Sequence, residues 1–363
     1  MKVKKILIFG AGAIGRGFIA PLLQSYNYKI AFVDKDKKLI KKIREKNFFK
    51  IAITNMNNYQ FKKIKVDQVF HINEKFNVKN YDMVFCCVGP KQCLKIAHKF
   101  KGAKTVISCE NDIFSVDYIK KLSGNKNVFF GIPDVITSNT ASPNLLKIDR
   151  LMTVTEKGIL VLQKGTYNLP KKILQVKKDY LHMHWRCKLF IHNAPHAMLA
   201  YLGYLKGYKY IHEAMRDPKI KKIIINAMNE ITKGVINSKY VEKKFAEKYK
   251  QKEIKRFSNK LLFDPILRVA REPLRKLGKD NRIILALRIA QWNNKFPKYT
   301  AMGLVAALNY YNKKDPESVH LQKLRKKFND SEVLEKICGI EQTDPLNNFC
   351  LSQDLKIFNK REF

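Results

Sequence analysis

A glycine-rich segment close to the N-terminus restricts the fold more than any other feature of the sequence. Gly10, Gly12 and Gly15 directly follow an apolar run, Lys5–Phe9, and open a helical pattern. In a dinucleotide-binding βαβ unit, the first glycine allows a tight turn, the second admits a pyrophosphate and the third lets the helix pack on the strand. The helix N-terminus then offers unpaired N–H groups to the phosphates. We therefore predict a cofactor-binding loop formed by Gly10, Ala11, Gly12, Ala13, Ile14 and Gly15.

A carboxylate follows this loop at the distance that a dinucleotide site requires. Asp34 ends the second apolar run, Lys29–Asp34, and lies 19 residues after Gly15. A carboxylate at this place accepts hydrogen bonds from the adenosine ribose hydroxyls and repels a 2′-phosphate. The predicted cofactor is therefore NAD rather than NADP.

The first half of the chain alternates β-rich runs with helical patterns, which is typical of a parallel α/β sheet. The predicted strands are residues 5–9, 29–34, 83–88, 105–109 and 128–132, and the predicted helices are residues 14–24 and 38–46. Residues 60–70 alternate as an added hairpin would, and residues 151–162 suggest an antiparallel pair that turns at Lys157 and Gly158. These patterns predict a Rossmann-type dinucleotide-binding domain, with added antiparallel strands, over residues 1–185.

Beyond this point the apolar residues recur with the period of an α-helix, as at Ile220, Ile223, Ile224 and Met228. Acidic residues followed by proline interrupt the pattern at intervals that fit helix boundaries. They are Asp217-Pro218, Asp264-Pro265, Glu272-Pro273, Asp315-Pro316 and Asp344-Pro345. We expect an all-α substrate domain over residues 186–363.

The composition bears on partners and location. The chain has 71 Lys and Arg against 31 Asp and Glu, a net charge of +40, which keeps a nucleic-acid-binding protein on a Rossmann scaffold open as an alternative. The excess is spread over both halves, and 58 of the cations are lysines, so we attribute it to drift in base composition and expect no nucleic-acid partner. The seven cysteines form no C-x-x-C pair, which favours free thiols in the cytoplasm. No apolar run approaches the ~18 residues of a membrane span.

A second group of polar residues opens the helical half. On a helix, positions 188, 192 and 196 would lie near one face, with position 193 close to it. Lys188, Asn193 and His196 could surround a carbonyl group there. An ordinary amphipathic helix would give the same pattern. A zinc site is a further alternative because His192 and His196 have i,i+4 spacing, although Asn193 replaces the glutamate of a metalloprotease and Pro195 would disturb the helix. The residues alone leave these readings open.

Three motifs together resemble the polyol-specific long-chain dehydrogenases, the mannitol dehydrogenase family. They are the glycine-rich opening, the Lys-x4-Asn-x2-His pattern at residues 188–196 and the basic segment at residues 268–277. The resemblance runs to about residue 345. It implies a Rossmann domain followed by a helical substrate domain, no metal, and NAD-linked interconversion of mannitol 1-phosphate and fructose 6-phosphate. Fructuronate and free mannitol are the alternative substrates.

The resemblance also implies roles for individual residues. Lys188 matches the general acid/base, and Asn193 and His196 match its substrate-orienting partners. Asn111 would be a second amide near the reacting oxygen and the cofactor. The matches to substrate-binding residues are Asp134, Arg268 and Lys276, with Arg275 a plausible phosphate ligand beside them.

The sequence departs from the family pattern at three places. Val135 replaces an arginine, Pro195 replaces a small residue, and Trp185 and Arg186 precede Lys188 where relatives often carry a glutamate. Val135 and Pro195 keep open a relative that binds without catalysis. The expected partner is a small sugar phosphate, and the expected assembly is a monomer or a homodimer in the cytoplasm.

Overall fold

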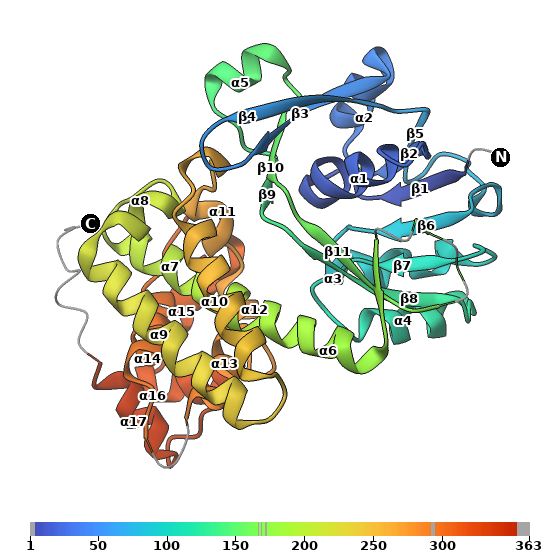
Figure 1. Cartoon of the computed structure of the whole chain (residues 1–363). Helices are drawn as coiled ribbons and strands as arrows, with labels where there is room; N and C mark the ends of the chain where they lie inside the picture. The colour runs from blue at the N-terminus through green and yellow to red at the C-terminus, as the bar shows by residue number, and fades with distance from the viewer. Residues whose placement is uncertain (1–3, 166, 168, 171–172, 292–294, 354–363) are drawn as a thin grey trace. The chain divides into compact units, whose positions relative to one another are not determined.

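The computed structural model describes residues 4–165, 167, 169–170, 173–291 and 295–353. The chain forms two compact units (Figure 1). The first contains residues 1–184 together with Leu261–Phe263, and the second contains Trp185–Lys260 and the residues from Asp264 onward.

The N-terminal unit is built on a sheet that has, within the described residues, the strand order β12-β11-β8-β7-β6-β1-β2-β5. The strands from β8 to β5 run parallel, as a dinucleotide-binding domain requires, and β11 is antiparallel to β8. Their bounds are β1 Lys5–Phe9, β2 Lys29–Asp34, β5 Gln68–His71, β6 Met83–Cys86, β7 Val106–Ser108, β8 Val128–Asp134, β11 Ile159–Gln163 and β12 Leu174–Val176. The five predicted strands are confirmed, with ends that differ by up to two residues.

A smaller sheet has the order β4-β3-β10-β9, with bounds β3 Phe48–Thr54, β4 Tyr59–Lys65, β9 Thr137–Ser138 and β10 Thr153–Glu156. The hairpin predicted for residues 60–70 is wrong. Its first half, β4, pairs antiparallel with β3, whereas β5 joins the large sheet beside β2. The chain changes sheet between these strands, since the Val66 N–H bonds to the Asn47 carbonyl and the Asp67 N–H bonds to the Ile30 carbonyl.

The antiparallel pair predicted for residues 151–162 is also wrong. Both strands exist, but β10 lies between β3 and β9 in the small sheet, and β11 lies between β8 and β12 in the large one. Residues on both faces of each strand are buried. A strand buried in this way needs a hydrogen-bonding neighbour on either side, which a lone hairpin cannot supply.

Most helices of the N-terminal unit connect parallel strands of the large sheet. The helix after the glycine-rich loop begins with a π-helical turn, Gly15–Ile19, and continues as α1, Ala20–Gln24. The other helices are α2 Lys37–Lys46, α3 Pro90–Ile96, α4 Ser115–Ser123 and α5 Pro143–Ile148, with 3₁₀ turns at Val78–Asn80 and Ala97–Phe100. Ile6 and Ile8 of β1 are fully buried in the core, where each such side chain contributes about 1.5–3 kcal/mol.

The C-terminal unit is helical. α6, Lys178–Cys187, begins in the N-terminal unit and continues into the second one, where a π-helical turn, Lys188–Asn193, leads into α7, Ala194–Leu205. The later helices are α8 Ile211–Arg216, α9 Pro218–Asn237, α10 Lys243–Phe257, α11 Ile266–Ala270, α12 Pro273–Leu277, α13 Arg282–Ala290, α14 Lys298–Leu308, α15 Pro316–Lys327, α16 Asp330–Val333 and α17 Pro345–Leu351, with further turns at Lys260–Leu262 and Leu334–Cys338. α7 packs against α11 and α14. Among the described residues, no helix combines the length and apolar character needed to cross a membrane.

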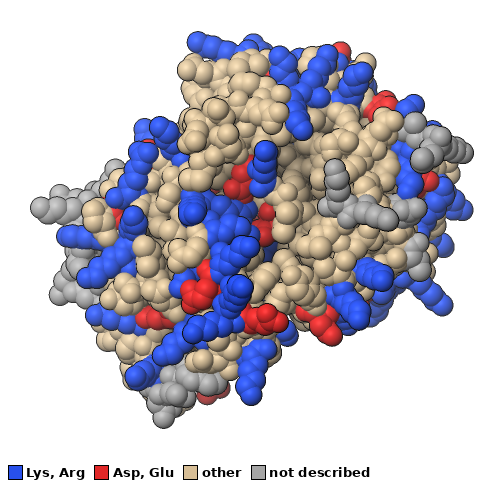
Figure 2. Space-filling model, in the orientation of Figure 1, with Lys and Arg blue, Asp and Glu red and all other residues tan. Residues whose placement is uncertain are grey.

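Lysine and arginine side chains are scattered over the face seen in Figure 2, with fewer acidic side chains among them. The cations on this face come from both the N-terminal and the helical unit. The picture fits a charge excess that is spread along the whole chain.

Candidate active site

The glycine-rich loop owes its shape to close backbone contacts. Gly10 has a φ of 97°, and a Cβ there would lie 2.4 Å from the Cys87 carbonyl oxygen. A Cβ on Gly15 would lie 2.0 Å from the Gly10 carbonyl oxygen, so the helix can follow the strand this closely only with glycine there. Gly12 differs, because no described atom lies within 4 Å of its Cβ position. The space beside Gly12 suits a ligand that must approach the backbone.

Asp34 fastens this loop to the end of β2. Its Oδ2 accepts the Ala11 N–H at 2.7 Å and its Oδ1 accepts the Asp36 N–H at 2.9 Å. A carboxylate has about four acceptor positions, so further hydrogen bonds remain open to ribose hydroxyls. The structure therefore brings Asp34 next to the predicted loop residues.

Arg16 was not predicted as a site residue, yet it lies buried under the loop. Its Nε donates to the Ala11 carbonyl at 2.6 Å, and its guanidinium also donates to the Leu151 carbonyl. Burial lowers the pKa of Arg16 to about 10, and the nearby charges of Asp34 and Asp149 act in the opposite direction. Arg16 thus remains cationic at neutral pH. The sequence signal was a charged residue within an otherwise small and apolar helix start.

The carboxyl ends of the next parallel strands place further predicted residues at the same edge of the sheet. Asn111 is exposed in the loop after β7, and Asp134 is buried at the end of β8. Glu110 precedes Asn111 in the same loop, and its Oε1 accepts the Val88 and Gly89 N–H groups at 2.8 and 3.0 Å. Burial raises the pKa of Glu110 to about 7, although these two hydrogen bonds act against the rise. Glu110 thereby fixes the loop that follows β6.

Lys188 begins the π-helical turn of the helical unit. The Ala194 N–H bonds to the Leu189 carbonyl five residues earlier, which widens the helix at this point. Lys188 and Asn193 are therefore about one turn apart, whereas regular α-helical spacing had grouped Lys188 with His192. Pro195 lies in the first turn of α7 and does not interrupt the helical run. Turns of this kind often occur at functional sites.

The two histidines of the predicted motif each face a different buried carboxylate. His192 Nδ1 lies 2.5 Å from Glu253 Oε2, and His196 Nε2 lies 2.9 Å from Asp264 Oδ2. Burial lowers the pKa of His192 to about 4, and for Glu253 burial is outweighed by His192 and Arg256, so its pKa falls to about 2. His192 is thus neutral beside an ionised Glu253. Within the described part of the chain, no group of three or more His, Cys, Asp or Glu side chains is arranged to hold a metal ion.

The predicted basic residues have different hydrogen-bonding partners. Arg268 on α11 donates to Asp264, from Nε at 3.0 Å and from Nη2 at 2.5 Å. On α12, Arg275 pairs with Glu272 at 2.7 Å, and Lys276, which is 4% exposed, donates to the Arg271 carbonyl. Arg268 and Arg275 therefore have different carboxylate partners, Asp264 and Glu272.

Arg282, at the start of α13, joins the α12 cations and was missed in the sequence. Burial lowers the pKa of Lys276 well below its ordinary value, and the charges of Arg282 and Arg275 lower it further. Burial likewise lowers the pKa of Arg282 to about 10, with a further contribution from Arg275. Because these cations repel one another, a bound anion would relieve the repulsion.

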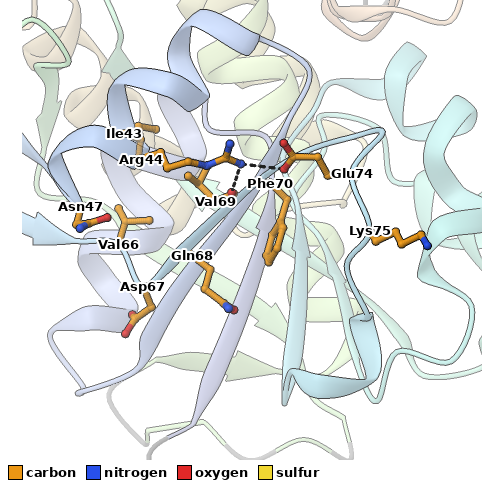
Figure 3. A pocket seen from close by; sticks show the side chains of 10 residues that line it. All are labelled: Ile43, Arg44, Asn47, Val66, Asp67, Gln68, Val69, Phe70, Glu74 and Lys75. Atoms are coloured by element: carbon orange, nitrogen blue, oxygen red, sulfur yellow. Dashed lines mark hydrogen bonds and ion pairs between the residues drawn. The ribbon is translucent and has the colours of Figure 1, made fainter.

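A cavity of about 470 Å³ beside α2 and β5 holds none of the predicted site residues (Figure 3). Arg44 points across it and donates to the Val69 carbonyl at 2.9 Å and to Glu74 at 2.8 Å. β5 ends the large sheet, so Arg44 satisfies a carbonyl that another strand would otherwise pair with. We interpret this hollow as a protected sheet edge.

The fold and the two residue groups define a Rossmann-type dehydrogenase with a separate helical domain. The mannitol dehydrogenase Rossmann domain matches residues 4–160, and the mannitol dehydrogenase C-terminal domain matches residues 180–341. The chain therefore belongs to the mannitol dehydrogenase family, which confirms the resemblance seen in its motifs.

Individual relatives agree with this assignment. The chain is 30% identical to a mannitol-1-phosphate 5-dehydrogenase of Thermoanaerobacter pseudethanolicus and 31% identical to one of Caldanaerobacter subterraneus subsp. tengcongensis; each alignment covers 94% of this chain and 95% of the relative. The structure is similar to that of Pseudomonas fluorescens mannitol 2-dehydrogenase in a ternary complex with NAD and D-mannitol, with a TM-score of 0.75, 16% identity and coverage of 96% of this chain and 90% of that one. This likeness confirms the predicted fold, while the roles of the site residues stay predictions.

Proposed function

We propose that this protein is an NAD-dependent dehydrogenase that interconverts D-mannitol 1-phosphate and D-fructose 6-phosphate without a metal. The observation that carries the proposal is the π-helical turn Lys188–Asn193, which sets an amine and an amide about one turn apart. Lys188 is only 9% exposed, as expected of a group held in a site. The names of the relatives in Thermoanaerobacter and Caldanaerobacter support this choice of substrate.

The N-terminal unit fits NAD. The open space at Gly12 admits the pyrophosphate, and the buried charge of Arg16 below the loop favours an anion there. Asp34 retains acceptor positions for the ribose hydroxyls and would repel the 2′-phosphate of NADP. When bound, NAD would supply the hydride acceptor for oxidation of the polyol carbon, and NADH the hydride donor for reduction of the ketose.

The chain's own residues handle the proton and the charge on the reacting oxygen. Lys188 takes the hydroxyl proton in the direction of oxidation and returns it in reduction. Asn193 and Asn111 donate amide hydrogen bonds to the oxygen as negative charge develops on it. His196 orients the substrate, and Asp134 accepts a polyol hydroxyl.

The basic residues account for the phosphate and the polyol chain. Lys276 and Arg275, with Arg282 beside them, bind the phosphate because an anion offsets the repulsion that lowers the pKa of Lys276. Arg268 donates to polyol hydroxyls. A free polyol would leave Lys276, Arg275 and Arg282 with Glu272, already paired with Arg275, as their nearby carboxylate, which favours the phosphorylated substrate.

NADH consumption with alternative ketoses tests the proposal. We expect rapid loss of NADH absorbance with fructose 6-phosphate, little with fructose or fructuronate, and much slower turnover with NADPH. If fructose were reduced as efficiently as fructose 6-phosphate, the assignment of a phosphorylated substrate would be wrong. If NADPH were used as efficiently as NADH, the proposed role of Asp34 would be wrong. Inactivity with every ketose would contradict the proposed function as a whole.

A further inference from the structure

We propose that Asp264 is a positioning residue that fixes His196 and Arg268 with one carboxylate, so that both address the same sugar-phosphate substrate. This inference rests on the proposed function. Asp264 Oδ2 lies 2.9 Å from His196 Nε2, while Oδ1 accepts two hydrogen bonds from Arg268. The two residues are 72 positions apart in the sequence and were predicted separately.

The sequence context of Asp264 shows that its carboxylate is not used as a helix cap. Five acidic residues precede a proline in the helical half. Asp217, Asp315 and Asp344 do what such residues commonly do, because each accepts a backbone N–H in the first turn of its helix. Asp264 makes no such bond to α11. Its carboxylate is turned to side chains of the predicted site instead.

The backbone around Asp264 is held from a third helix. The Asp264 carbonyl accepts the Ile211 N–H at 3.0 Å at the start of α8, and Tyr210 forms a β-bridge with Pro265. α7, which carries His196, packs against both α8 and α11. The carboxylate, which is 4% exposed, is therefore placed by the fold and not by its own flexibility.

The imidazole of His196 is fixed on two sides. Its ring stacks on Phe257 with a centroid distance of 5.1 Å and an interplanar angle of 15°. Nε2 lies 2.9 Å from Asp264 Oδ2, so the two groups interact through their charges, although the atoms are not aligned as a hydrogen bond. Although burial raises the pKa of Asp264, the charges of Arg268 and His196 outweigh it and keep the pKa below its ordinary value. An ionised carboxylate at Nε2 stabilises a proton there.

The consequence concerns the other ring nitrogen. In a neutral His196 whose proton is on Nε2, Nδ1 is a hydrogen-bond acceptor. His196 would then accept a hydrogen bond from a substrate hydroxyl, while the N–H groups of Arg268 that Asp264 does not use donate to a neighbouring oxygen. Asp264 thus sets an acceptor and a donor side by side for adjacent hydroxyls of the substrate.

The test is Asp264→Asn, which keeps the shape and an acceptor oxygen but removes the charge that selects the histidine tautomer. We expect kcat/KM for fructose 6-phosphate to fall at least about tenfold, with the NADH dissociation constant unchanged. The matched control is Asp217→Asn, which removes the charge of a half-buried carboxylate paired with Lys206 at 2.6 Å and retains the helix cap. This control should keep wild-type turnover.

A double-mutant cycle separates positioning from general loss of structure. Because Asp264 acts in part through His196, Asp264→Asn should reduce kcat/KM clearly less when His196→Ala is present than in the wild type, and the remaining loss reports its action through Arg268. Additive losses would overturn the proposal, as would wild-type kinetics in Asp264→Asn.

If Arg268, left without its partner, destabilises the single variant, Arg268→Gln should restore the melting temperature while the loss in kcat persists. Recovery of kcat to the level of Arg268→Gln alone would overturn the proposal. An inactive wild-type enzyme would instead overturn the proposed function, and this inference with it.

Discussion

The two predicted groups of site residues are built in different ways. In the N-terminal unit the cofactor loop depends on backbone contacts, such as that between Gly15 and the Gly10 carbonyl, five residues apart. In the helical unit the site depends on charged side chains that meet from distant positions, such as His192 and Glu253, 61 residues apart. The steric requirements of the glycine loop can therefore be recognised in a short sequence motif. The charge pairs of the helical unit depend instead on how its helices pack.

The largest expected effect comes from the helical unit. Lys188→Ala should reduce turnover by about 10²–10⁴, the usual contribution of a positioned acid or base. Lys250→Ala is a matched control, because Lys250 is equally buried in the same unit but pairs with Glu247 and Asn229. Steady-state NADH oxidation should show near-wild-type turnover for the control. A Lys188→Ala enzyme as active as the control would contradict the acid/base assignment.

The glycine loop allows a matched pair of substitutions. Gly12→Ala puts a methyl group into open space, so the protein should fold normally but bind NADH at least about tenfold more weakly, or about 1.4 kcal/mol. Gly15→Ala puts the same methyl group against the Gly10 carbonyl and should lower the free energy of unfolding by about 1–3 kcal/mol. Urea unfolding and NADH fluorescence titration measure the two effects. If both variants only lost stability, the open space at Gly12 would have no ligand-binding role.

The α12 cations give a smaller effect that is confined to the substrate. Lys276→Met should raise the KM for fructose 6-phosphate about tenfold, within the range of a lost charge-assisted hydrogen bond. Its NADH dissociation constant should stay as in the wild type, because the cofactor loop lies in the other unit. An unchanged KM would show that the substrate phosphate does not bind at the α12 cations.

The smallest effect concerns Glu110, which belongs to the backbone-determined group although it carries a charge. Its pKa is raised to about 7 by burial, so the folded protein retains a proton that the unfolded chain releases above about 4.5. The stabilisation is complete below that pH and is lost as the pH rises through 7. Glu110→Gln removes this dependence. Urea unfolding at pH 5 and pH 8 should show the wild type losing on the order of 1 kcal/mol relative to the variant, and equal pH dependence in both proteins would contradict the raised pKa.

The sequence was informative where geometry is local. The strand, the glycine loop and Asp34 lie within 34 residues, and each glycine had a steric reason that the structure reproduces for Gly10 and Gly15. The added strands were harder to predict. β10 and β11 follow one another closely in sequence but join different sheets, and their pairing depends on partners such as β3 and β8 that are far away in the chain.

In the helical unit, too, the contacts between residues far apart in the chain could not be predicted from the sequence. Lys188 and Asn193 could be found because they share a motif, but the π-helical turn that relates them leaves no clear sequence signal. Glu253 and Asp264 were not found, because an acidic residue in a helix or before a proline is ordinarily exposed or a cap. Arg282 was missed for a similar reason, since its relation to Lys276 depends on how α12 and α13 pack.

The central claim is that the glycine loop binds the cofactor and that Lys188 transfers the proton without a metal. NADH titration and fructose 6-phosphate reduction, measured in EDTA on the wild type, Gly12→Ala and Lys188→Ala, test it most directly. We predict an active wild type, a Gly12→Ala variant that binds NADH weakly, and a Lys188→Ala variant that binds NADH normally but has lost turnover. The claim would be contradicted if EDTA reversibly abolished wild-type turnover, or if Lys188→Ala reduced fructose 6-phosphate as fast as the wild type.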